Sequence, residues 1–377
     1  MGWQRVVEQV DFRAEMMRLG EQPGTNIREL CRRFGVSAKT YYKWRGRYQV
    51  GGVGSLENRS RRPQASPKRS SKEVEKAVLE LRRQHPHWGA RKIEVLIQKQ
   101  IEDAPARSTI HDILRRNGCI SEAESLKHRA WQRFEHEQPN HLWQMDFKGW
   151  SKKESGYRCE PLSVVDDHSR FALCLEACSD QQTQTVRDRL TTVFRRYGLP
   201  EQMVMDNGSP WGYNADRQHT PLTTWLMQLG VKVSHCRPYH PQTQGKVERF
   251  HRTLQIELLQ ENHFRNRTDA QNAFDRWRDF YNQHRPHQAL HMAVPASRYR
   301  ISSRQFPEKL PLPQYNSTDL VRSVDRKGHI QFKSRRFLIS KGFRGLSVAL
   351  RHTEHDGIWD VFFYSHKIAA INLLQST

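Results

Sequence analysis

Acidic residues are scarce in this chain of 377 residues, and the shortage extends from one end to the other. The sequence has 40 Asp and Glu against 62 Lys and Arg, which leaves a formal net charge of +22. A solvated basic surface can explain a short run of charge, but an excess spread over the whole chain favours a polyanionic partner. Nucleic acid is the leading candidate for that partner.

Long apolar runs are also missing, so no segment is expected to span a membrane. The first residues, M-G-W-Q-R-V-V-E-Q-V-D-F, carry charges where a secretory signal needs an apolar stretch. The six cysteines form no C-x-x-C pair and do not accompany histidines at zinc-finger spacing. We therefore expect a cytoplasmic protein with reduced, packed thiols and no zinc. Hydrophobic residues at 36% are enough for ordinary cores and exclude disorder throughout the chain.

Residues 1–50 have the pattern of three helices, the last two of which resemble a helix-turn-helix. In N-I-R-E-L-C-R-R-F-G-V-S-A-K-T-Y-Y-K-W, Gly35 can end one helix and Ser37 can cap the next. The next helix would bury Tyr41 and Trp44. A plain helical hairpin would give the same pattern, but the surrounding arginines favour a helix that enters the major groove. The residues expected to face DNA are Lys39, Thr40, Tyr42 and Lys43.

Residues 51–70, G-G-V-G-S-L-E-N-R-S-R-R-P-Q-A-S-P-K-R-S, are rich in Gly, Ser, Pro and Arg. We interpret this segment as a basic linker that follows a phosphate backbone or minor groove, with Arg61 and Arg62 as contacts. An unbound, solvated tether explains the composition equally well. Both interpretations predict that the segment has no packed core of its own.

Residues 71–119 are expected to form a second helical unit. Apolar residues recur at helical spacing in three runs, and Gly118 can end the last helix. We interpret the unit as a second helix-turn-helix, followed by a charged connector over residues 120–139. Its residues expected to contact DNA are Arg107, His111, Arg115 and Arg116.

From residue 140 the sequence alternates between strand-like and helix-like runs, which predicts a mixed α/β layer fold over residues 140–300. A hairpin is expected to turn at Asp167-His168-Ser169, and T-Q-G-K-V-E-R-F-H-R-T-L-Q-I-E-L-L is expected to be the long final helix. Short alternating runs punctuated by glycines then predict a small all-β barrel over residues 318–377. The expected architecture is therefore multidomain, with all-α units, an α/β core and an all-β end.

Three acidic residues occupy positions suited to catalysis. Asp146 lies in an otherwise apolar strand, Asp206 follows the strand V-M-D, and Glu248 lies beside the buried stripe of the last predicted helix. Each alone is better explained as a cap or an ion-pair partner. Together they could hold two Mg²⁺ ions about 3.5–4 Å apart, since hard cations take oxygen ligands and phosphodiester cleavage needs an activated oxygen nucleophile.

Five blocks of the sequence resemble the integrase core shared by retroviral integrases and many insertion-sequence transposases. The blocks are M-D-F-K-G, V-V-D-D-H-S-R, M-D-N-G-S-P-W, R-P-Y-H-P-Q-T-Q-G-K-V-E-R-F-H-R-T-L and Y-N-Q-H-R-P-H-Q-A-L, in the family's order. The upstream helix-turn-helix, the G-S-L-E-N-R-S-R-R-P segment and H-P-H-W-G-A-R-K-I resemble the single-reading-frame insertion-sequence branch. The resemblance covers nearly the whole chain.

This resemblance implies an RNase H-like core in which Asp146, Asp206 and Glu248 are the catalytic, metal-binding (DDE) triad. It implies Mg²⁺, with Mn²⁺ as a substitute, and 3′-end cleavage of transposon DNA followed by transfer into target DNA. It also implies a homodimer or a larger assembly, and a bacterial, nucleoid-associated location. The residues near the triad expected to contact DNA are Tyr239 and Gln244 of a mobile loop and Lys246, Arg249 and Arg252 of the following helix.

The sequence departs from the family pattern in one spacing. Asp206 and Glu248 lie 42 positions apart, wider than is usual, and Gly212 to Pro221 is expected to form the extra loop. Asp166 and Asp167 are rival carboxylates, which a hairpin turn explains as turn residues. A catalytically silent DNA-binding regulator and a nuclease without joining activity are the alternative functions.

Overall fold

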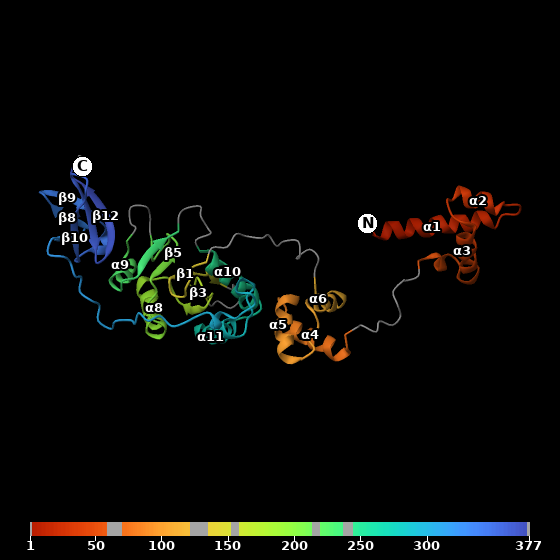
Figure 1. Ribbon diagram of the computed structural model, residues 1–377, viewed down its shortest axis with the longest axis horizontal. Coiled ribbons are helices and arrows are strands. Elements are labelled where there is room, and N and C mark those ends of the chain that lie inside the picture. Colours follow the sequence, from red (N-terminus) through yellow and green to blue (C-terminus); the bar gives the residue numbers. More distant parts are fainter. Residues whose placement is uncertain are drawn as a thin grey trace. The chain divides into compact units, whose positions relative to one another are not determined.

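The computed structural model describes residues 2–58, 70–120, 135–151, 158–212, 219–236 and 244–374. Arg61, Arg62, Tyr239, most of the connector and most of the expected loop from Gly212 to Pro221 lie outside these ranges. The chain divides into two compact units, Met1–Arg69 and Ser70–Thr377, which are described one at a time (Figure 1). No helix within the described ranges is long and apolar enough to cross a membrane.

The first unit confirms the three predicted helices. They are α1 (Gly2–Gly20), α2 (Ile27–Arg33) and α3 (Ala38–Gly51), followed by a short 3-10 helix, η1 (Val53–Leu56). Gly35 follows α2 with φ of +64°, a conformation that glycine adopts without strain, and the Ser37 hydroxyl accepts the Thr40 amide at the start of α3. Tyr41 and Trp44 are buried, as expected.

The predicted boundary between this unit and the linker at residue 50 is wrong. Leu56 is fully buried in the core of the first unit, and the Arg13 guanidinium donates a hydrogen bond of 2.6 Å to its carbonyl oxygen. The glycines before it led to the linker interpretation, but the apolar side chain that follows them docks on the helices. The described part of the linker segment, residues 51–58, therefore belongs to the first unit.

The second helical unit contains α4 (Lys72–Gln84), α5 (Ala90–Gln100) and α6 (Arg107–Arg116). The three helices share one apolar core, built from Val78, Leu81, Trp88, Ile93, Ile97, Ile110, Ile113 and Leu114. Gly118 has φ of +69° directly after α6, as predicted for the residue that ends this helix. The helical character of the unit is confirmed.

The α/β core is built on a mixed sheet with helices on both faces. Its strands are β1 (Leu142–Phe147), β2 (Trp150–Ser151), β3 (Arg158–Asp166), β4 (Ala172–Cys178), β5 (Gln202–Met205) and β6 (Lys232–His235). The strand order is β4-β3-β1-β5-β6, with β2 also pairing β3. The strands β1, β5 and β6 are parallel, whereas β3 is antiparallel to β1 and β4.

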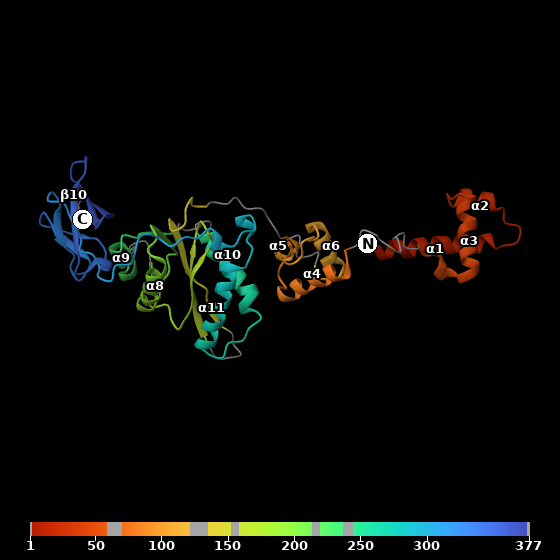
Figure 2. The ribbon, with the colours of Figure 1, turned by 60° about the horizontal axis from the view of Figure 1, so that its bottom comes forward.

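The helices of the core are α8 (Thr183–Tyr197), α9 (Pro221–Gln228), α10 (Gly245–Leu254) and α11 (Arg267–Gln283). Apolar side chains of α8 and α9 pack on one face of the sheet, and those of α10 and α11 pack on the other. Figure 2 shows the strands between these two pairs of helices. The expected α/β layer fold is confirmed.

Two predicted details of the core are wrong. The run after Gly245 is not the final helix, because α10 passes into a π-helical turn (Gln255–Leu259) and α11 follows with its own buried stripe. The packing of the core also continues beyond residue 300, since Phe306 lies against the cluster that includes α8. The i, i+3, i+4 spacing of apolar residues in α11 was a readable signal for the missed helix.

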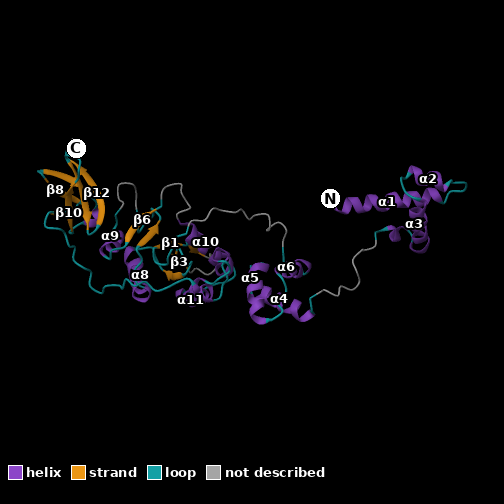
Figure 3. Cartoon of the chain, viewed as in Figure 1, coloured by secondary structure: helices purple, strands orange, loops and turns teal. Residues whose placement is uncertain are grey.

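The C-terminal region is all-β, as predicted, and Figure 3 shows the change from helices to strands along the chain. Its strands are β7 (Leu320–Ser323), β8 (His329–Phe332), β9 (Arg335–Leu338), β10 (Ser347–His352), β11 (Ile358–Phe363) and β12 (His366–Asn372). Pairing among the described residues gives a four-stranded sheet, β12-β11-β10-β7, and the hairpin β8-β9, rather than one closed barrel. The core shared by these strands also includes Met227 of α9, so the region docks on the α/β core.

Candidate active site

The two aspartates of the predicted triad project from neighbouring strands. Asp146 lies near the end of β1, and Asp206 directly follows β5. These strands are parallel and hydrogen-bonded, with Gln144 opposite Val204, so their carboxyl ends meet at the same edge of the sheet. The sheet therefore brings together two acids that are 60 positions apart in the sequence.

Glu248 joins them electrostatically from the first turn of α10, where its side chain is exposed. Burial, the nearby Asp206 carboxylate and the Glu248 carboxylate together raise the pKa of Asp146 to about 7. Burial and the same three acids raise the pKa of the Cys236 thiol to about 11. One edge of the sheet thus carries carboxylates that burial and mutual repulsion perturb, which is typical of a functional site.

Asp206 is held by the residues that follow it. The Gly208 amide donates a hydrogen bond of 2.9 Å to its Oδ1, and the Trp211 indole donates another to the same oxygen. The Trp211 ring is buried and stacks on Phe147 of β1, with ring centroids 5.3 Å apart. A Cβ at Gly208 would lie only 3.2 Å from both carboxylate oxygens. The sequence analysis noted the M-D-N-G-S-P-W block but missed this role for Trp211.

The donor set of the site suits a hard divalent cation. The three acids offer only oxygen ligands, and the pKa of Asp146 is raised first by burial and then by the negative charges of Asp206 and Glu248, which a bound cation would neutralise. As placed, no three His, Cys, Asp or Glu side chains in the described ranges converge to hold a metal ion. The exposed Glu248 side chain would have to turn toward the aspartates, a rotation that its position on the helix allows.

His251 is a neighbour of the triad that the sequence analysis did not single out. It lies one turn after Glu248 on α10, and its Nδ1 is 3.6 Å from Asp146 Oδ2. Burial lowers the pKa of His251 to about 3, so its imidazole is neutral near pH 7. It therefore contributes a neutral polar group, and not a positive charge, to this side of the site.

Two residues near the triad that were expected to contact DNA have internal partners instead. Lys246 Nζ lies 2.7 Å from Asp167 Oδ1, and the two side chains are 12% and 1% exposed. The buried Gln244 side chain donates a hydrogen bond of 3.2 Å to the Met145 carbonyl oxygen. The helix-face pattern placed Lys246 outward, but a buried carboxylate from another element draws it inward. Arg249 and Arg252 are exposed, in keeping with the expectation.

The rival carboxylates Asp166 and Asp167 are structural, as the hairpin interpretation predicts. Asp166 accepts hydrogen bonds from the Asn140 amide and from both the amide and the hydroxyl of Ser169, at 2.5–2.8 Å. Asp167 accepts from the His136 amide and the Gln144 side chain in addition to its pairing with Lys246. Both are fully buried, so neither is open to substrate.

The predicted recognition residues of the first unit lie on the surface of α3. Lys39, Tyr42 and Lys43 are exposed, whereas Thr40 is half-buried, with its hydroxyl 2.9 Å from that of Ser37. The Tyr42 ring is 54% exposed. This face can present two cations and one aromatic ring to a ligand.

In the second helical unit, His111 is exposed on α6. The three arginines that were expected to bind phosphates already form ion pairs. The contacts are Arg107 to Glu94 at 2.7 Å, Arg115 to Asp112 at 2.9 Å and Arg116 to Glu75 at 2.8 Å. The exposed pair of Arg115 is weak and can exchange for phosphate, whereas Glu94 and Glu75 are only 16% and 14% exposed. The sequence pattern identified the surface but not these competing carboxylates.

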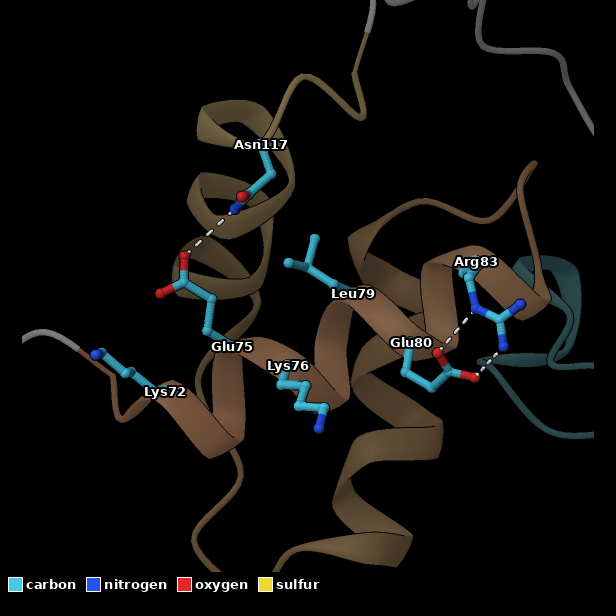
Figure 4. A pocket seen from close by; sticks show the side chains of 7 residues that line it. All are labelled: Lys72, Glu75, Lys76, Leu79, Glu80, Arg83 and Asn117. Carbon is cyan, nitrogen blue, oxygen red and sulfur yellow. Dashed lines mark hydrogen bonds and ion pairs between the residues drawn. The ribbon is translucent and has the colours of Figure 1, made fainter.

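An open groove between α4 and the end of α6 lies on this second unit and not beside the triad (Figure 4). Its lining carries both signs of charge: Lys72, Glu75, Lys76, Leu79, Glu80, Arg83 and Asn117. Glu80 is paired with Arg83 at 2.6 Å, and Glu75 accepts from the Asn117 amide at 3.3 Å. The groove has mixed charge and paired acids, so it is no second carboxylate centre.

The second helical unit is joined to the α/β core beside the catalytic helix. The Trp88 indole donates a hydrogen bond of 3.2 Å to Glu257, which lies in the π-helical turn after α10. Arg285 donates three hydrogen bonds of 2.8–3.1 Å to the same carboxylate. His85, Trp88 and Phe280 of α11 stack on one another, with ring centroids 4.1–5.8 Å apart. The joint is therefore built from both aromatic packing and a buried ion pair.

Comparison with known protein families assigns the parts of the chain. Two models of the integrase core domain match residues 136–241 and 229–295. A helix-turn-helix domain matches residues 12–64, a homeodomain-like domain matches residues 40–114, and the C-terminal domain of IS481 family transposases matches residues 319–377. These matches confirm the helix-turn-helix units, the RNase H-like core and the insertion-sequence resemblance.

Similar proteins come from insertion elements. An uncharacterized 31.7 kDa protein of insertion element IS407 from Burkholderia multivorans is 24% identical over 238 residues, which cover 62% of this chain and 82% of the relative. An uncharacterized 39.2 kDa protein of insertion element IS476 from Xanthomonas euvesicatoria is 27% identical over 158 residues, covering 42% of this chain and 44% of the relative. The chain thus spans less than half of the second relative.

Solved structures of integrases are also similar. The catalytic core domain of BIV integrase matches with a TM-score of 0.33 and 21% identity, over 42% of this chain and 92% of that one. A simian T-cell lymphotropic virus intasome in complex with a PP2A regulatory subunit matches with a TM-score of 0.37 and 15% identity, over 78% of this chain and 99% of that one.

Proposed function

Because the chain has the helix-turn-helix domains, the integrase core and the IS481-type C-terminal domain of an insertion-sequence transposase, we propose that it cuts transposon ends and joins them to target DNA. The observation that carries this proposal is that two neighbouring parallel strands bring Asp146 and Asp206 together at one edge of the sheet, within electrostatic reach of Glu248 on α10. The reaction is 3′-end cleavage by water followed by attack of the freed 3′-hydroxyl on target DNA.

In this proposal Asp146, Asp206 and Glu248 would hold two Mg²⁺ ions, for which Mn²⁺ could substitute. Such ions would lower the pKa of an attacking oxygen and neutralise charge on the scissile phosphate. The protein fixes the acids: the Gly208 amide and the Trp211 indole set the orientation of the Asp206 carboxylate. The neutral His251 leaves the negative charge of Asp146 available for the cations.

DNA recognition is assigned to the outer surfaces of the helical units. The exposed side chains of α3 and His111 of α6 would read transposon ends, and the exposed Arg249 and Arg252 of α10 would bind phosphates near the triad. The C-terminal all-β domain would add non-specific affinity for the backbone. The partners are therefore transposon-end DNA and target DNA, and pairing two ends requires a homodimer or a larger assembly.

The test is metal-dependent cleavage of DNA that carries the element's own ends, with wild type, Asp206→Asn and Asp188→Asn. Asp188 is an exposed acid of α8 and serves as a matched control. Wild type and the control should nick and join the ends, while Asp206→Asn should bind them equally well and do neither. Binding without cleavage by wild type in Mg²⁺ and Mn²⁺ would favour a silent regulator, and cleavage without joined products would favour a nuclease.

A further inference from the structure

The N-terminus of α10, the helix that carries Glu248, is not capped by its own sequence. Its N-cap residue, Gln244, makes no side-chain hydrogen bond to the first turn. The first amides of a helix have no partner within the helix and need an acceptor from elsewhere. The acceptor here comes from the central strand of the sheet.

Gln144 of β1 supplies that acceptor. Its side-chain Oε1 accepts the amides of Lys246 and Val247, each at 3.1 Å, and the side chain is fully buried. Gln144 precedes Asp146 by two positions on the same strand, so both side chains lie on the face of the sheet that α10 covers. The strand that bears one catalytic acid thus caps the helix that bears another.

Asp167 closes the network from the β3–β4 turn. Its Oδ1 accepts a hydrogen bond of 2.8 Å from the Gln144 amide nitrogen and lies 2.7 Å from Lys246 Nζ. Its own backbone amide donates to the Leu142 carbonyl oxygen of β1 at 2.9 Å. The carboxylate is therefore anchored to β1 and in turn fixes both Gln144 and Lys246.

We propose that Gln144, Asp167 and Lys246 form a positioning network that sets α10 against β1, and so sets Glu248 relative to Asp146. The inference rests on the proposed function, since it concerns the same three acids. Lys246 is thereby a positioning residue and not a phosphate contact. A misplacement of about 1 Å at a catalytic group can lower the rate about 100-fold, so a loose helix end is enough to impair cleavage.

The experiment is a double-mutant cycle in the full chain with Lys246→Met, Asp167→Asn and the double variant. Each single variant should lower the single-turnover cleavage rate by about 10- to 100-fold, and the double variant should be no slower than the worse single one. The affinity for end DNA and its salt dependence should stay as in wild type.

A phosphate contact would behave differently: Lys246→Met would weaken binding and reduce the salt slope by about 1, while Asp167→Asn would not. That result, or multiplicative losses of rate, would overturn the proposal.

A second measurement does not depend on activity. Gln144→Leu removes the acceptor, so the amides of Lys246 and Val247 should exchange with solvent at least about 10-fold faster, while amides in the middle of α11 stay protected. Unchanged protection would overturn the capping role.

If wild type shows no cleavage, the proposed function fails, and hydrogen exchange still tests the positioning network. Arg265→Met, at an exposed ion pair with Asp269, is the control for loss of a cation and should change neither rate nor exchange. If Asp167→Asn unfolds the core, Lys246→Met carries the test, because methionine keeps the unbranched stem.

Discussion

Removing Arg285 should destabilise the α/β core far more than removing an exposed arginine. Arg285 and Glu257 are 10% and 12% exposed and share three hydrogen bonds, so the change to methionine leaves a carboxylate buried without its main partner. Losing one partner of a buried pair costs about 3–5 kcal/mol. We expect about 3 kcal/mol, at the lower end of that range, because Glu257 keeps the Trp88 indole and the nearby Lys92 charge.

The loss should depend on pH in a defined direction. Burial alone would raise the pKa of Glu257, but Arg285, Lys92 and the Trp88 indole together hold it below its ordinary 4.5. A carboxyl whose folded pKa is lowered stabilises the fold above the unfolded pKa, and that contribution disappears as the pH falls through the folded value. The difference between wild type and Arg285→Met should therefore be largest near pH 7 and shrink below about pH 4.5, where the unfolded chain takes up the proton.

The assay is urea denaturation of the full chain at pH 7 and at pH 4. The midpoint and the slope of each transition are compared between variants. Arg265→Met is the control, since its ion pair with Asp269 is exposed, and it should show no measurable loss. If Arg285→Met is no less stable than this control at pH 7, the buried pair does not stabilise the contact between the second helical unit and the α/β core, and the reasoning fails. A loss that stays constant down to pH 4 would show that the methionine disturbs packing instead of charge.

Three further results are expected. Trp211→Phe removes the indole donor to Asp206 and keeps the stacking ring, so it should lower the cleavage rate about 10-fold with little change in melting temperature; an unchanged rate would contradict the orienting role. Gly20→Ala places a Cβ against the Tyr41 side chain and should lower the free energy of unfolding of the first unit by about 1–3 kcal/mol. Tyr41→Phe should change that free energy little, because the buried hydroxyl has no hydrogen-bond partner among the described residues. The affinity for end DNA should fall about 10³- to 10⁵-fold between 50 and 200 mM salt if six to ten phosphates are bound, and a flat titration would contradict that mode of binding.

Features that depend on a few neighbouring residues could be predicted from the sequence. Gly35 ends a helix and Ser37 caps the next because a positive φ and an N-cap hydrogen bond involve only adjacent residues. The proximity of Asp146 and Asp206 was predictable because one lies in an apolar strand run, the other follows such a run, and the family resemblance aligned them. The α/β layering, although not its exact end, followed from hydrophobic periodicity.

Contacts between distant elements could not be predicted in this way. The sequence marks Lys246 as a cation on a polar helix face, and nothing near it shows that Asp167 is buried within reach. Trp88 and Glu257 are 169 positions apart, so their hydrogen bond exists only once the second helical unit is docked. Leu56 was assigned to a linker because glycines precede it, although a single buried apolar side chain is enough to tie a short segment to a core.

The helix α10, which carries Glu248, is held differently at its two ends, and this separates two kinds of perturbation. Its N-terminal end, which carries Glu248, is held by Gln144 of β1 and by the ion pair of Lys246 with Asp167 in the β3–β4 turn. Its C-terminal end passes through the π-helical turn to Glu257 and from there to the second helical unit. Because each end of α10 is held by its own set of contacts, Arg285→Met should affect stability more than rate, and Lys246→Met should affect rate more than stability. Equal effects of both variants on both quantities would mean that α10 couples the second helical unit rigidly to Asp146 and Glu248.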